Sequence, residues 1–224
     1  MNVLNRSEWA VLGALVIYSF IPVVGGLIRL LELAGGPAIA PENLRALAAP
    51  VPVILHILSS TLFCTLGAIQ FLPSVRRHHP AAHRCSGHVV AAAGCVSAGT
   101  GLWMTHFFSF PADLQGDLLY AVRMILGCVM IGHIAWAVVA VRSRNISGHR
   151  AAMLRAYAIG QGASTQSILG IAWIVIQGTE PLGLARDSMM VIAWMLNLVA
   201  AELVVQRVLK RKPGPSSELI THNR

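Results

Sequence analysis

Six apolar segments, each about 20 residues or longer, occupy most of the chain. They cover residues 9–33, 51–72, 88–110, 118–141, 152–177 and 188–209. Each is long enough to cross ~30 Å of hydrocarbon as a helix. A bilayer offers no partners to free backbone groups, so such runs predict membrane-spanning helices. We therefore expect an all-α protein: a six-transmembrane-helix bundle over residues 1–212, followed by a disordered cytoplasmic tail over 213–224.

The charge of the chain supports this interpretation. Charged residues make up only 12% of the sequence, roughly half the fraction typical of a soluble domain. The net charge of +8 comes mainly from cations in short loops, which fits the positive-inside rule and not nucleic-acid binding. Six crossings place most of these cations on one side. We therefore expect both termini in the cytoplasm and the bundle in a bacterial inner membrane.

Several ionisable side chains lie within the apolar segments or at their ends. An ionisable residue inside a bilayer is costly and by default marks a functional site. His88 and His106 are 18 residues apart, or ~27 Å along one face of one helix. Sorting by depth gives an outer group of His56, His106 and Arg123. The inner group consists of His88, His133, His149, Arg155, Glu202 and Gln70.

Two of these groups carry a permanent charge that needs a partner. Arg123 requires a carboxylate, carbonyls or water, and three acidic residues have a compatible depth: Asp113, Asp117 and Glu32. Arg155 and Glu202 share the inner third of the bundle, so we expect an ion pair between them. The predicted polar pocket contains Gln70, Arg155, Tyr157, Gln161, Thr165, Gln166, Asn197 and Glu202.

Short motifs in the inner loops resemble a known family. The run His83-Arg84-Cys85-Ser86-Gly87 resembles an HRxxG element. The run that begins Gly148-His149-Arg150 and ends Tyr157-Ala158 resembles an HRxWMxRxYA element, with Ala152 in place of the tryptophan. Together with His56 and Gly67-Ala-Ile-Gln70-Phe71, these elements are similar to the DUF2306 family of bacterial membrane proteins. The resemblance extends from about Arg45 to Glu202.

The family is named for having no known function, so the resemblance implies a helical membrane bundle with an inner polar cluster and supplies no reaction. It implies five positions of interest: His56, His83, His149, Arg150 and Arg155. His88 and His133 are not part of the family pattern.

The first functional hypothesis is electron transfer through b-type haem, linked to quinone. Haem iron takes axial histidines from facing helices. The layout is similar to that of cytochrome b561-like proteins, which hold a haem near each membrane surface. The candidate cofactor-binding residues are His56, His106, His88, His133, His149 and Arg123. Among them, His56 and His133 are the candidate ligands of haem iron. His56 would pair with His106 at the outer iron, and His133 with His88 or His149 at the inner one.

Two other hypotheses remain open. The polar pocket around Arg155 and Glu202 is typical of a small-molecule or proton-coupled transporter. The short loops and the absence of a soluble catalytic domain also suit an accessory subunit, whose partners would be other proteins of a membrane complex.

Overall fold

The computed structural model describes residues 4–39 and 43–210, which form helices and no strand. In chain order the helices are α1 (Arg6–Leu33), α2 (Leu44–Ala48), α3 (Pro50–Gln70), α4 (Pro73–His78), α5 (Pro80–Phe107), α6 (Asp117–Arg142), α7 (Ile146–Gly160), α8 (Gly162–Gln177) and α9 (Gly183–Lys210).

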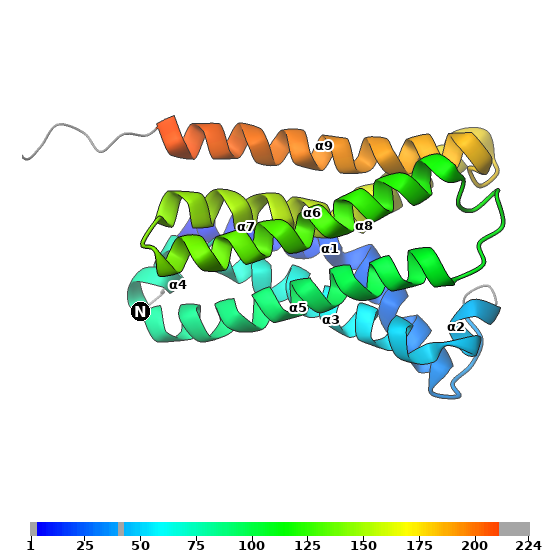
Figure 1. The fold of residues 1–224 in the computed structure, drawn as a ribbon, viewed down its shortest axis with the longest axis horizontal. Helices are drawn as coiled ribbons and strands as arrows, with labels where there is room; N and C mark the ends of the chain where they lie inside the picture. Colours follow the sequence, from blue (N-terminus) through cyan, green and yellow to red (C-terminus); the bar gives the residue numbers. More distant parts are fainter. Residues whose placement is uncertain (1–3, 40–42, 211–224) are drawn as a thin grey trace, which may run out of the picture.

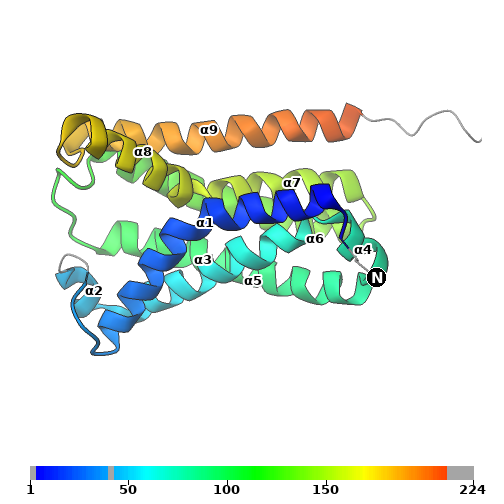
Figure 2. The ribbon, with the colours of Figure 1, turned by 180° about the vertical axis from the view of Figure 1, so that it is seen from behind.

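The long helices run side by side along one axis of the molecule (Figure 1). Short α4 lies at one end of the bundle and short α2 at the other, which we call the α4 end and the α2 end. The beginning of α1 and the end of α9 both lie at the α4 end, as the view from behind also shows (Figure 2). Both ends of the described chain therefore lie on one side, as an even number of crossings requires.

Five helical segments within the described residues are long and apolar enough to cross a membrane. They are 6–33, 50–70, 117–142, 146–177 and 183–207. The third predicted segment, 88–110, corresponds to α5, which does not meet this criterion. Its 28 residues nevertheless contact both α3 and α6, so α5 has the position that a sixth crossing would require.

Local structure differs from the predicted segments in two places. Between the first two segments lies the short helix α2, where the Asn43 side chain caps the amide of Ala46. The segment predicted at 152–177 is interrupted at Gln161, which separates α7 from α8. The predicted disordered tail, 213–224, lies outside the described residues.

Burial in this bundle favours small residues inside and large apolar residues outside. Alanines line much of the core, which also holds the fully buried Phe63 and Ile134. Large side chains such as Ile17, Val175 and Ile176 are at least 75% exposed. Lipid tails are as apolar as these side chains, so the outward face is what a membrane bundle requires.

Glycines permit the closest helix contacts. A Cβ at Gly94 would lie 2.6 Å from the Phe63 ring and 2.7 Å from Ile134. A Cβ at Gly162 would overlap the indole nitrogen of Trp194 in α9. The helices can therefore approach this closely only because these two positions lack a side chain.

We predict that Gly162→Ala destabilises the bundle by about 1–3 kcal/mol, because the new methyl group displaces Trp194. Thermal unfolding in detergent would measure the effect. Gly132→Ala is the matched control, because nothing lies within 4 Å of its Cβ position. An equal loss of stability in both variants would contradict the packing account.

Candidate functional site

Arg123 lies about two turns inside α6 from its α2 end. Its guanidinium donates a hydrogen bond to the Gln115 side-chain oxygen, and Nη2 lies 3.7 Å from the Met190 sulfur. Among the described residues no carboxylate forms an ion pair with it, so the acidic partners predicted from the sequence do not take that role. A positive charge in a spanning helix is thus held by an amide and a thioether.

A second guanidinium shares an aromatic neighbour with the first. The guanidinium carbon of Arg45 lies 4.7 Å from the centre of the Phe110 ring, and that of Arg123 lies 5.6 Å from it. Such cation–π contacts stabilise each arginine modestly. The like charge that acts on Arg123 is that of Arg186. The buried Nε of Arg45 has no hydrogen-bond partner. Arg45 therefore has donor capacity that the described residues around it do not fill.

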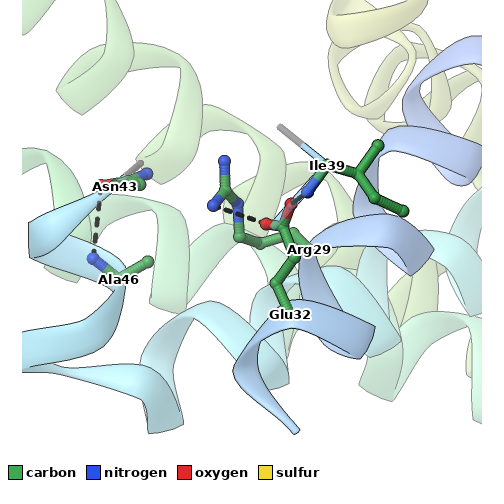
Figure 3. A network of polar contacts seen from close by, with 5 residues as sticks. All are labelled: Arg29, Glu32, Ile39, Asn43 and Ala46. Atoms are coloured by element: carbon green, nitrogen blue, oxygen red, sulfur yellow. Dashed lines mark hydrogen bonds and ion pairs between the residues drawn. The ribbon is translucent and has the colours of Figure 1, made fainter. Parts of the chain in front are cut away.

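Acidic groups at this end have other partners. The buried carboxylate of Asp187 accepts the amides of Gly116 and Leu119, both at 3.3 Å, and so caps the start of α6. Glu32 pairs with Arg29 at 2.7 Å and accepts the amide of Ile39, and both contacts are drawn in Figure 3. Asp187 is close enough for its charge to act on Arg123, without direct contact.

His56 of α3 lies near this site. Its Nδ1 lies 3.0 Å from the Ser97 carbonyl and 3.2 Å from the Thr100 hydroxyl of α5. The ring packs against Gly101 and is close enough to Arg123 for their charges to interact. Two members of the predicted outer group, His56 and Arg123, thus lie in one neighbourhood.

The remaining candidate histidines do not join them. His106 is exposed and meets the Tyr120 hydroxyl of α6 at 2.9 Å. His88 is exposed, and its Nδ1 forms a hydrogen bond with the Arg84 backbone carbonyl in the same helix. Nδ1 of His149 forms one with the Ala137 backbone carbonyl. Half-buried His133 lies near Arg155. The described chain contains no group of three or more His, Cys, Asp or Glu residues placed to hold a metal ion.

A closed hydrogen-bond network surrounds the interruption between α7 and α8. Gln161 donates to the Tyr157 hydroxyl and to Ser19, both at 2.8 Å, and accepts from Ser164 at 2.7 Å. The Tyr157 hydroxyl then donates to the Cys64 carbonyl at 2.8 Å. This network ties α1, α3, α7 and α8 together in the interior.

The carbonyls at the end of α7 need partners from outside the helix. Side chains of α9 supply two of them: Trp194 donates to Ile159 at 3.1 Å, and Asn197 donates to Ala158 at 3.2 Å. The Asn197 oxygen accepts from Thr165 at 2.7 Å and from Tyr18 at 2.9 Å, and those two hydroxyls also contact each other. These carbonyls at the interruption therefore have hydrogen-bond partners within the protein.

The ion pair predicted between Arg155 and Glu202 is present. Nε and Nη2 of Arg155 lie 3.0 and 2.7 Å from one carboxylate oxygen of Glu202. Two further residues of the predicted pocket form hydrogen bonds away from this ion pair. Gln70 donates to the Ser86 hydroxyl, and Gln166 donates to the Met190 carbonyl. The predicted pocket is therefore several separate contacts between helices.

Cations from three helices converge at the α4 end. They are Arg76 and Arg77 of α4, His83 and Arg84 of α5, and His149 and Arg150 of α7. Burial and the charge of Arg150 lower the pKa of Arg76. Burial and the charges of Arg76 and His149 lower the pKa of His83. These shifts indicate like charges held close together.

Sequence reasoning missed several residues of these sites. Tyr18 and Ser19 are adjacent polar residues in the first apolar segment, and that break in hydrophobicity is the signal that could have identified them. Gln115, Phe110 and Asp187 lie in or near loops, where no periodicity places them. Only the folded chain brings them to Arg123.

We predict that Tyr157→Phe costs about 1–3 kcal/mol, because it removes partners from the buried Cys64 carbonyl and from Gln161. Thermal unfolding in detergent would measure the loss. Tyr120→Phe removes one exposed contact to His106 and should change stability little. The network would have no structural role if the two variants behaved alike.

None of the curated proteins matches this chain, and neither does any of the solved structures. A family model described as "Predicted membrane protein (DUF2306)" matches residues 53–205. The matched region begins within α3 and ends within α9, so it spans most of the bundle, including His56, Arg123 and the interrupted α7–α8 segment. The chain is thus a membrane protein with several candidate spanning helices, and it belongs to the DUF2306 family.

Proposed function

We propose that the protein binds a small organic anion at its α2 end and carries it across the membrane. The observation that carries the proposal is Arg123, a charge in a spanning helix without a carboxylate partner among the described residues. An arginine at this depth is costly, and its usual roles lie in ion or substrate pathways.

The surroundings favour an anion with an apolar body. A guanidinium offers a planar set of donors that matches a carboxylate. Phe110 and Met190 present an aromatic ring and a thioether next to those donors. A ligand with a carboxylate head and an apolar body would complement both features.

Polar groups beside the arginine site and further along the bundle support movement as well as binding. His56 lies beside the arginine site, and the Tyr18, Thr165 and Asn197 contacts lie between helices further along the bundle. Arg155, Glu202 and His133 form a third polar group, on α7, α9 and α6. These groups supply polar positions between the arginine site and the α4 end.

The orientation in the membrane is part of the same proposal. Exposed arginines of α4, α5 and the α6–α7 turn lie at the α4 end. By the positive-inside rule this end faces the cytoplasm of a bacterial inner membrane. The anion site at the α2 end then faces the opposite compartment.

Haem-linked electron transfer is the second candidate, and His56 is the observation that favours it. Histidines that bind a metal usually hold the other ring nitrogen in a hydrogen bond, and the Nδ1 contact with Ser97 would leave Nε2 for iron. The predicted second ligand, His106, contacts α6 at an exposed position, whereas His56 packs against Gly101. The residues therefore fit one axial ligand and not the predicted pair.

Benzoate and its uncharged isostere benzamide test the anion site. We expect benzoate, but not benzamide, to raise the thermal midpoint of the purified protein. Arg123→Gln should weaken benzoate binding about tenfold or more, because one charge-assisted contact contributes ~1.5–3 kcal/mol. Arg123→Lys should weaken it less. Vesicles containing the protein should take up radiolabelled benzoate at a rate that Arg123→Gln lowers.

Arg142→Gln is the control, since it removes an exposed charge from the opposite end of the same helix. Equal effects of benzoate and benzamide, or of the two arginine variants, would refute the anion site. An absorption spectrum after haem-replete expression separates the two candidates. A Soret band that is lost in His56→Ala would favour haem over anion transport.

A further inference from the structure

We propose that Arg76, His83, His149 and Arg150 form a binding site for a phosphate group at the α4 end. This inference does not rest on the anion site near Arg123, because the two groups occupy opposite ends of the bundle. The phosphate can belong to a lipid headgroup or to a soluble molecule, and the experiment below distinguishes these sources.

The four side chains come from α4, α5 and α7 and are close enough for their charges to interact. The charge of Arg150 acts on Arg76, and both Arg76 and His149 act on His83. The positive-inside rule accounts for cations at this end, but it does not require helices distant in sequence to bring them together. Such convergence is what a shared anionic ligand would stabilise.

One histidine in this group has unused hydrogen-bonding capacity. The buried Nδ1 of His83 has no hydrogen-bond partner. His149, in contrast, holds Nδ1 against the Ala137 carbonyl at 3.0 Å, which fixes its ring. A buried polar atom without a partner is costly, and a phosphate oxygen could provide one.

No described carboxylate forms an ion pair with these four side chains, although the charge of neighbouring Arg77 acts on Glu8. Glu8, which is buried near α4, accepts hydrogen bonds from the Ser74 amide at 2.7 Å, the Ser74 hydroxyl at 2.6 Å and the Asn5 amide at 3.0 Å. These bonds attach the start of α1 to α4, and Arg76 lies two residues beyond Ser74. Glu8 thus fixes the helix that carries Arg76 and forms no ion pair with the cluster.

Phosphate suits these donors better than a carboxylate does. A phosphate presents three or more oxygens in a tetrahedral array, whereas a carboxylate presents two in a plane. Donors on three helices can bond different oxygens of one phosphate, and arginine is well suited to phosphate. Basic pockets between helices at the cytoplasmic surface are also where lipid headgroups bind.

Native mass spectrometry of the delipidated full chain in a neutral detergent tests the lipid source, with phosphatidylglycerol as probe and diacylglycerol as the phosphate-free comparison. Thermal stability in phosphate-free buffer, with added pyrophosphate, tests the soluble source. We expect saturable binding of at least one phosphate probe. Arg76→Gln with Arg150→Gln should weaken it about tenfold or more.

Arg142→Gln with Arg144→Gln is the matched control, because it removes the same charge from exposed positions at the same end. A selective loss in the Arg76 and Arg150 pair supports the site, and the responding probe identifies the phosphate source. The proposal is overturned by equal losses in both pairs, by diacylglycerol binding as strongly as phosphatidylglycerol, or by no saturable binding of either phosphate probe.

Discussion

The rest of the bundle depends on one constraint: polar groups within the hydrocarbon region must find partners inside the protein. The interruption at Gln161 shows how this chain meets it. Trp194 and Asn197 of α9 donate to carbonyls at the end of α7, and Gln161 bonds Tyr157 and Ser19. An interrupted helix is tolerated there because other helices supply the missing partners. The same contacts fix how those helices pack.

Close packing and polar satisfaction support each other in this region. Gly162 lets Trp194 approach α8, and that approach is what brings the indole nitrogen to the Ile159 carbonyl. In a lipid solvent there is no general hydrophobic drive between helices, so such contacts determine which faces meet. The result is an interior of small residues and a few well-bonded polar groups. Large apolar side chains remain on the outside.

The two ends of the bundle differ from this interior. Around Arg123 and Arg45, and again around Arg76 and His83, cations lie together without ion pairs to described carboxylates. The nearby acids Asp187 and Glu8 instead hold backbone amides in place. Each end thus combines a rigid attachment between helices with basic groups that have spare donors. That combination is why both proposed sites are anion sites.

The sequence by itself determined the class of fold, because apolar length and loop charge depend only on local composition. It also predicted the Arg155–Glu202 pair, since two opposite charges at one depth have few alternatives. Only the tertiary structure decided which polar residues meet. It separated His106 from His56, placed Arg123 beside Gln115 and Phe110, and brought Tyr18 and Ser19 into the interior. Helical periodicity gives the face of a residue on its own helix, whereas packing decides which neighbour that face meets.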